Sequence, residues 1–315
     1  MKVAVLQGGR SLERGVSLRS GARVEDALNR LGHEPLPLDV GADLVERLIA
    51  EPPDAAFVAL HGPGGEDGTV QELLEILDIP YTGPGVAACA RCMDKTLAKH
   101  ELREADIPTP DWFAFNATAF RELGAADALE QIEARLGFPL VVKPASGGSA
   151  LGVKLVSDRD EVPQALVAAF SYDDRVLLER YVRGRELAVS VLGSDALPIV
   201  EAIPRESDLY DFEARYEIGR TDFVCPADID GETATAVTEA ALRAFSTLGC
   251  SGFSRVDLML GDEGPEVLEV NAIPGLTDTS LLPQAAEAAG LDFDELVERA
   301  LELALQHRPD PAVRR

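Results

Sequence analysis

No run of 18 apolar residues occurs in the sequence, so it contains no segment typical of a membrane-spanning helix. The opening residues, MKVAVLQGG, hold too short an apolar run for a secretory signal peptide and lack a cleavage-type ending. Low-complexity tracts and internal repeats are also missing, which argues against a disordered chain and a repeat array. We therefore predict a cytoplasmic globular protein without a membrane partner.

Basic residues are few compared with acidic ones: 29 lysines and arginines stand against 55 aspartates and glutamates, a formal charge of -26. Nucleic acids and anionic membranes attract basic surfaces, so this balance argues against both as partners. An anionic substrate would have to be held by a few local cations, against the field of the whole protein. A halotolerant or highly soluble cytosolic protein is the simplest explanation of the acid excess.

Cysteine is rare, with four residues in the chain: Cys89, Cys92, Cys225 and Cys250. The pair Cys89-x-x-Cys92 has the spacing of metal ligands, but no second pair or nearby histidine completes a zinc site. It lies in an alanine-rich stretch typical of a helix. We interpret the pair as two buried thiols of a protein from a reducing compartment.

With 315 residues the chain should form two or three domains, and residues 1–92 alternate strand and helix patterns. Such alternation predicts a parallel sheet with helices on both faces and ligands at the carboxyl ends of its strands. Glu13 and His61 fall at such ends. We expect strands at 3–6, 33–40, 54–60 and 79–83, and helices at 16–31, 42–50 and 69–77.

Two further regions follow, so the expected division is 1–92, 93–182 and 183–315. Their strands are expected at 138–144, 153–156, 176–182, 186–193, 196–203, 253–260 and 266–273, and their helices at 95–105, 118–136, 160–170, 232–248 and 292–306. Long or glycine-rich loops at 145–152 and 205–222 have no structural reason, which suggests function.

The loop SGGSALG (146–152) lies between two expected strands, shortly after Lys143. Glycines let backbone N–H groups approach phosphate oxygens, and a lysine supplies positive charge. The loop matches neither the GxxxxGK[ST] phosphate loop nor the strand–GxGxxG–helix dinucleotide motif. An ordinary flexible hairpin is the alternative interpretation.

Polar residues interrupt two apolar strands near the C-terminus, FSRVDLML (253–260) and VLEVNAIPG (267–275). Side chains alternate along a strand, so Glu269 and Asn271 share one face while Leu268 and Val270 share the other. The short GDEGP connection predicts a hairpin that brings Asp257 to the same face. Carboxylate and amide oxygens suit Mg²⁺ completed by phosphates and water, whereas a half-buried strand with one wet face is the alternative. Like charges buried without a cation would be costly, which favours the magnesium site.

With these residues, the chain resembles the ATP-grasp enzymes and specifically the D-alanine–D-alanine ligase family. The resemblance covers almost the whole chain and implies a three-domain ATP-grasp architecture of the α/β and α+β classes, with an N-terminal Rossmann-like parallel sheet. Its markers are GGRSLERGVSLRSG (8–21), ALHGPGGEDGTVQ (59–71), IPYTGPG (79–85), MDK (93–95), KPASGGSALG (143–152), YDFEARY (210–216), SRVD (254–257), EVNAIPG (269–275) and TSLLPQAA (279–286).

The resemblance assigns a nucleotide and a metal to this chain. It implies that ATP contacts Lys95, Lys143, Gly148, Ser149, Glu179, Arg180, Val182 and Glu186. The two lysines would hold phosphates, Glu179 and the backbone after it the adenine, and Glu186 the ribose. Asp257, Glu269 and Asn271 match ligands of Mg²⁺, with two ions implied and Mn²⁺ as a substitute.

The resemblance also assigns the substrate side. Glu13 would hold the ammonium group of the first D-alanine, with His61 nearby, and Arg255 and the Gly275 N–H would form an oxyanion site. Ser280 and Leu281 would contact the second D-alanine. Ser149 and Tyr216 match a network with Glu13 that closes the 205–222 loop as a lid. The chain departs from the family pattern at Arg215, where lysine is usual, at Gly147 and at Ala150, which leaves individual phosphate-loop contacts open.

The implied reaction uses ATP to activate one D-alanine as an acyl phosphate, which the amine of a second D-alanine attacks, for peptidoglycan precursor synthesis. Because the dipeptide-forming enzymes carry this tyrosine, the resemblance implies through Tyr216 that D-alanine and not D-lactate is the nucleophile; a tyrosine that only packs the lid is the alternative. A carboxylate–amine ligase with another second substrate and a non-catalytic ATP-binding relative are the alternatives. A homodimer is expected from the resemblance alone.

Overall fold

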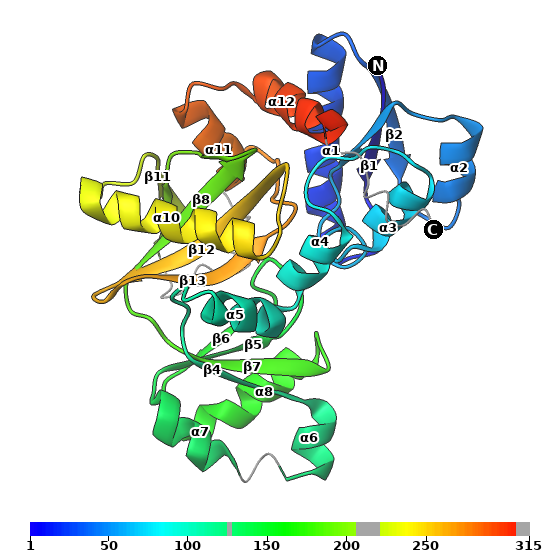
Figure 1. Ribbon diagram of the computed structural model, residues 1–315. Helices are drawn as coiled ribbons and strands as arrows, with labels where there is room; N and C mark the ends of the chain where they lie inside the picture. Colours follow the sequence, from blue (N-terminus) through cyan, green and yellow to red (C-terminus); the bar gives the residue numbers. More distant parts are fainter. Residues whose placement is uncertain (125–127, 206–220, 307–315) are drawn as a thin grey trace.

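The computed structural model describes residues 1–124, 128–205 and 221–306, which form three sheets (Figure 1). The first is parallel, with strand order β2-β1-β3. Its elements are β1 (Lys2–Gln7), α1 (Arg14–Arg30), β2 (Glu34–Asp39), α2 (Leu44–Ala50), β3 (Ala55–Val58) and α3 (Thr69–Ile76). Alternate residues of β1 point into two different apolar cores, Ala4 and Leu6 into one and Val3 and Val5 into the other. Helices therefore cover both faces, as the sequence predicts.

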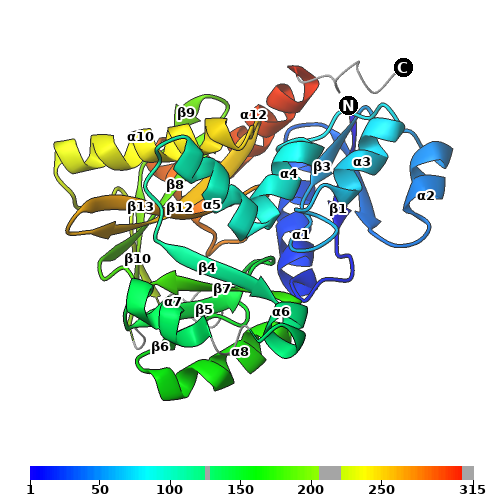
Figure 2. The same cartoon turned by 60° about the horizontal axis from the view of Figure 1, so that its bottom comes forward.

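The second sheet is antiparallel, with order β4-β7-β5-β6, and the turned view in Figure 2 brings it forward. Two helices, α4 (Val86–Met93) and α5 (Lys95–Glu104), precede it. Its elements are β4 (Trp112–Asn116), α6 (Ala117–Glu122), α7 (Leu129–Leu136), β5 (Leu140–Pro144), β6 (Lys154–Val156), the 3₁₀ turn η2 (Arg159–Glu161), α8 (Val162–Phe170) and β7 (Arg175–Arg180). A core of its own, built from 113–178, holds this sheet to its helices.

The third sheet is also antiparallel, with order β11-β10-β8-β12-β13 and β9 beside β8. Its elements are β8 (Arg185–Leu192), β9 (Asp195–Ala196), β10 (Val200–Pro204), β11 (Thr221–Val224), α10 (Gly231–Thr247), β12 (Phe253–Gly261), β13 (Gly264–Asn271), α11 (Leu281–Ala288) and α12 (Phe293–Gln306). The last helix returns to the first sheet, because α12 packs on β3 and on α1. Figure 1 shows α12 beside α1.

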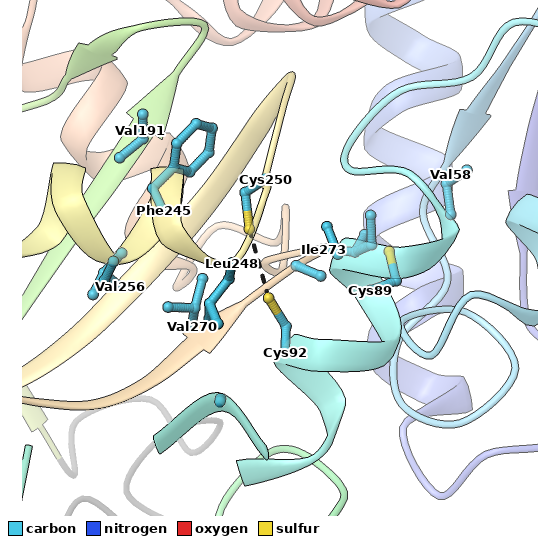
Figure 3. Close-up of a cluster of buried hydrophobic side chains, with 14 of the residues drawn as sticks. Val58, Cys89, Cys92, Val191, Phe245, Leu248, Cys250, Val256, Val270 and Ile273 are labelled. Carbon is cyan, nitrogen blue, oxygen red and sulfur yellow. Dashed lines mark hydrogen bonds between the residues drawn. The ribbon is translucent and has the colours of Figure 1, made fainter. Parts of the chain in front are cut away.

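The largest core joins the first and third sheets through α4 (Figure 3). Cys89 and Cys92 are buried in it with free thiols, as predicted, and the Sγ atoms of Cys92 and Cys250 lie 3.5 Å apart. Burial raises the pKa of the Cys89 thiol, so it packs as a small apolar group. Within the described residues no helix is long and apolar enough to cross a membrane.

Most expected elements are present, but three expectations differ from the structure. The expected helix at 118–136 is two helices, α6 and α7, and Gly124 at φ 71° follows the first of them. The expected strand at 79–83 is only an isolated bridge between Ala56 and Tyr81. The expected strand at 196–203 is divided: β9 ends at Ala196 and β10 begins at Val200, with Pro198, which has no N–H to donate, between them. The strands β4 and β11 and the helix α11 were not expected, because their apolar runs are short.

Candidate active site

Two neighbouring pockets lie along the β12–β13 hairpin. The large pocket lies between the second and third sheets, and its lining includes Lys95, Lys143, Gly148, Glu179, Arg180, Val182, Glu186, Asp257 and Glu269. The small pocket faces the first sheet, and its lining includes Glu13, His61, Glu66, Ser149, Arg255, Asn271, Gly275, Ser280 and Leu281. The structure thus gathers the predicted site residues at two adjoining pockets, except for Arg215 and Tyr216, which lie outside the described residues, as does most of the 205–222 loop.

A buried carboxylate stands at one end of the large pocket. Glu179, the penultimate residue of β7, is 2% exposed and lies between two ammonium groups. Its Oε1 is 2.7 Å from Lys143 Nζ, and its Oε2 is 2.7 Å from Lys99 Nζ. Burial raises the pKa of Glu179, but the charges of Lys143 and Lys99 outweigh it and hold that pKa below its ordinary value. Glu179 is therefore an ionised, fixed acceptor.

Lys95 links the glycine loop to the hairpin. It is the first residue of α5, whose start is capped by Asp94: this carboxylate accepts hydrogen bonds from the N–H groups of Thr96 and Leu97. From that position Lys95 Nζ donates to the Gly147 carbonyl at 2.5 Å and lies 3.2 Å from Glu269 Oε2. A cation is thus fixed at the mouth of the glycine loop.

The hairpin places its polar residues as the sequence predicts. Asp257 pairs with Glu269 and Arg255 with Asn271 across the two strands. Arg255 donates twice to Asp257, at 2.6 and 2.7 Å, and the Asn271 amide donates to Asp257 at 3.0 Å. These contacts make one rigid polar face that reaches into both pockets.

One orientation on this strand was predicted wrongly. Simple alternation places Leu268 on the face opposite Glu269, but Leu268 lines the large pocket beside it. The register shifts between Asp257 and Leu258, so Asp257 pairs with Glu269 while Leu258 pairs with Val267. Leu268 is the extra residue of a β-bulge, and such a residue turns away from regular alternation.

The oxygen donors of Asp257, Glu269 and Asn271 form an incomplete set for a metal ion. Within the described residues, no group of three or more histidine, cysteine, aspartate or glutamate side chains could hold a metal alone. Two carboxylates and an amide nevertheless fit Mg²⁺, which commonly takes a few protein oxygens and completes its shell with phosphates and water. Arg255 and Lys95 balance the two carboxylates in this structure.

The small pocket joins the first sheet to the glycine loop. Glu13 stands between β1 and α1, is 5% exposed, and accepts a hydrogen bond from the Ser149 hydroxyl. Ser149 and Ala150 both have a positive φ, of 53° and 55°, so the loop takes a left-handed turn here without glycine. Burial and the neighbouring Glu66 raise the pKa of Glu13, and Ser149, His61 and Lys95 partly oppose this.

Glu66 is a residue that the sequence reasoning missed, because one acidic residue in a GGEDG loop reads as solvated surface. It is 9% exposed, and its Oε1 lies 3.4 Å from Nδ1 of His61. The other ring nitrogen, Nε2, lies 3.0 Å from the Ser20 hydroxyl. These contacts fix the orientation of a histidine that lines the pocket wall.

The remaining wall of the small pocket is the turn into α11. The Ser280 hydroxyl accepts a hydrogen bond from the Thr277 N–H at 3.0 Å, and Leu281 opens the helix. A Cβ at Gly275 would lie 2.7 Å from Ser280 Oγ, so a side chain at this position would displace the Ser280 hydroxyl.

Comparisons with known proteins agree with this geometry. The family model "D-ala D-ala ligase C-terminus" matches residues 102–302, and "D-ala D-ala ligase N-terminus" matches residues 45–84. A D-alanine–D-alanine ligase of Syntrophotalea carbinolica is 45% identical over 300 residues, 95% of each chain. The chain belongs to the D-alanine–D-alanine ligase family. This membership confirms the family, the fold class and the ligase activity predicted from the sequence.

Solved structures of family members match throughout their length. The D-alanine–D-alanine ligase of Bacillus anthracis has a TM-score of 0.86 at 38% identity, with 98% of each chain covered. Its complex with ATP has a TM-score of 0.83 at 36% identity, with the same coverage. A D-Ala:D-Ser ligase of Enterococcus faecalis has a TM-score of 0.80 at 30% identity, covering 96% of this chain and 99% of that one.

Proposed function

We propose that this ligase binds ATP in the large pocket and joins two D-alanines in the small one. The observation that carries the proposal is the shared β12–β13 face, because Asp257 and Glu269 line one pocket while Arg255 and Asn271 line the other. A group transferred from one pocket to the other would pass along this face. The ATP complex of the Bacillus anthracis relative supports ATP as the occupant of the large pocket.

In this pocket Lys95 and Lys143 would hold the phosphates together with the backbone at Gly148 and Ser149. Glu179, as a fixed carboxylate, would accept a hydrogen bond from the exocyclic amine of adenine, which would lie beside Arg180 and Val182. Glu186 would accept hydrogen bonds from the ribose hydroxyls. Asp257, Glu269 and Asn271 would hold two Mg²⁺ ions, and Mn²⁺ could replace Mg²⁺. When bound, the metal neutralises charge on the phosphates.

The first D-alanine would bind with its ammonium group on Glu13, near His61. Its carboxylate would then face the glycine loop, where one carboxylate oxygen attacks the γ-phosphorus and ADP leaves with the electron pair of the broken P–O bond. Lys95 and Lys143 stabilise charge that develops in this step, and their fixed positions require little reorganisation. The product of the step is an acyl phosphate.

The second D-alanine would place its carboxylate at Ser280, with Leu281 beside it. Its neutral amine attacks the acyl carbon, the C–O bond to the phosphate breaks with its electron pair on the departing phosphate, and the nitrogen loses its extra proton to that phosphate. Arg255 and the Gly275 N–H, which both belong to the lining of this pocket, would stabilise the oxyanion of the tetrahedral intermediate. The roles of Arg215 and Tyr216, the cytoplasmic location, the homodimer and the domain division at 92/93 and 182/183 stay predictions.

A ligase that takes another second substrate is the competing candidate, because the Enterococcus faecalis relative is a D-Ala:D-Ser ligase. ADP release should be measured with D-alanine alone and with D-alanine plus D-serine, D-lactate or an L-amino acid, and the products weighed by mass spectrometry. We expect D-alanyl-D-alanine as the main product. ADP release that needs a different second substrate would replace the proposal, and no ADP release with any of them would make the chain a non-catalytic relative.

A further inference from the structure

Lysine is used sparingly in this chain. Only five of the 29 basic residues are lysines: Lys2, Lys95, Lys99, Lys143 and Lys154. Three of these five are buried beside the large pocket. Lys95 and Lys143 line the pocket and have proposed phosphate contacts. Lys99 is 0% exposed, does not line the pocket, and has no part in the chemistry described above.

The Lys99 ammonium group is held on all sides. It lies one helical turn after Lys95 on α5 and donates to the Pro110 carbonyl at 3.1 Å and to the Thr109 hydroxyl. Its Nζ also lies 5.1 Å from the centre of the Trp112 ring. The Thr109 hydroxyl in turn donates to the Val267 carbonyl of β13 at 2.8 Å. Lys99 therefore cannot turn toward a ligand.

The fourth contact of Lys99 is the Glu179 carboxylate, whose two oxygens are divided between two lysines. The side chain of Lys143 has room to move because it borders the pocket, whereas that of Lys99 is enclosed. Burial lowers the pKa of Lys99 to about 8, although the charge of Glu179 opposes the shift. Were Lys143 to turn toward a phosphate, Lys99 would still lie 2.7 Å from Glu179 Oε2.

We propose that Lys99 is a positioning residue: it is the permanent counterion of Glu179, and it thereby releases Lys143 to the phosphates of ATP. A buried carboxylate that loses its last counterion is strongly destabilised. Without Lys99, Glu179 would retain Lys143, and the phosphate site would lose a cation. This inference rests on the proposed function, because it takes ATP as the occupant of the large pocket.

The test compares a ligand with phosphates and one without them. Calorimetry at saturating Mg²⁺ gives the dissociation constants of ATP and adenosine, and their ratio measures what the phosphates contribute. In Lys99→Met we expect ATP to bind at least about tenfold more weakly, while adenosine binding changes by less than about threefold. Lys2→Met, the same substitution at the start of β1, should leave both constants as in the parent.

A double variant separates this role from simple packing. In Lys99→Met/Glu179→Gln there is no carboxylate at position 179 to hold Lys143 away from the phosphates. The ratio of the adenosine and ATP dissociation constants should therefore return toward that of the parent. If Lys99 only packs the site, Lys99→Met weakens both ligands by the same factor and the second substitution restores nothing. That result would overturn the proposal. Thermal unfolding of each variant checks the fold, and Lys99→Gln, which is neutral but polar, replaces Lys99→Met if the latter does not fold.

Binding of ATP and adenosine to the parent distinguishes a failure of the proposed function from a failure of the role proposed for Lys99. If the parent binds ATP no more tightly than adenosine, the large pocket is not a phosphate site, and both the proposed function and the role of Lys99 fail. If the parent prefers ATP and Lys99→Met keeps the full preference, only the role of Lys99 fails.

Discussion

Replacing Ser149 with alanine removes the hydrogen bond that its hydroxyl donates to Glu13. The change should leave the loop backbone intact, because the next residue, Ala150, already adopts a left-handed φ of 55° with an alanine side chain. The substitution removes only one hydroxyl group from the side chain. Ser149→Ala therefore tests the contact itself, with little disturbance of the fold.

The size of the effect follows from the environment of Glu13, which is 5% exposed. A hydrogen bond to a charged group contributes about 1.5–3 kcal/mol. Since about 1.4 kcal/mol corresponds to a factor of ten, kcat/KM for D-alanine should fall about 10- to 100-fold. The bond also favours the charged form of Glu13, so its loss should raise the pKa of Glu13 further.

Two measurements follow from Ser149→Ala. ADP release titrated with D-alanine should show the lower kcat/KM for D-alanine, while KM for ATP stays within about twofold of the parent value. The acidic limb of the pH profile should move to higher pH, because Glu13 must be ionised to hold an ammonium group. Ser157→Ala, at an exposed serine whose backbone N–H bonds Glu161, is the matched control. A pH profile unchanged from the parent would refute the reasoning.

Three further substitutions test other parts of the site. Glu66→Gln removes a charge that raises the pKa of Glu13, so the acidic limb of kcat/KM should move to lower pH; an unmoved limb would contradict the coupling of the two carboxylates. Glu269→Gln removes one carboxylate of the metal set, and the Mg²⁺ concentration for half-maximal ADP release should rise about tenfold or more, whereas an unchanged Mg²⁺ dependence speaks against Glu269 as a ligand. Gly275→Ala places a Cβ 2.7 Å from Ser280 Oγ, so KM for D-alanine should rise while KM for ATP stays within about twofold; equal changes in both would point to general unfolding.

The sequence predicted the hairpin because its polar residues recur at a spacing of two inside apolar strands. That pattern gave the pairing of Asp257 with Glu269. It could not give the position of Leu268, because a β-bulge inserts one residue without any change in the apolar pattern. The division of 118–136 into two helices had a signal, Gly124, but a single glycine does not always end a helix.

Lys99 and Glu66 show a different limit. A lysine four residues after another lysine in a helix predicts a solvated face, and only the tertiary structure shows that the second is enclosed by β4 and β7. Glu66 reads as loop surface for the same reason. Burial of a charge depends on partners far away in the chain, such as Glu179 for Lys99, so local patterns do not reveal it.

The choice of second substrate can be tested through pH without any substitution. D-alanine must lose an ammonium proton before it attacks, whereas D-lactate attacks through a hydroxyl that is already neutral. Below the pKa of the amine, each unit of pH changes the fraction of free amine about tenfold. Arg255 lines the same pocket, where its positive charge favours the neutral form of the amine against the opposing charges of Glu13 and Glu66. We therefore expect the amide to exceed the ester at neutral pH.

The assay offers D-alanine and D-lactate together at equal concentration and measures both products by mass spectrometry across a pH series. The amide-to-ester ratio should rise with pH and then level off as the bound amine becomes neutral. D-serine is the matched control, because it is also an amine and its competition with D-alanine should change little with pH. An ester that predominates at neutral pH, or a ratio to D-serine that shifts as steeply as the ratio to D-lactate, would show that proton loss from the amine does not select the nucleophile.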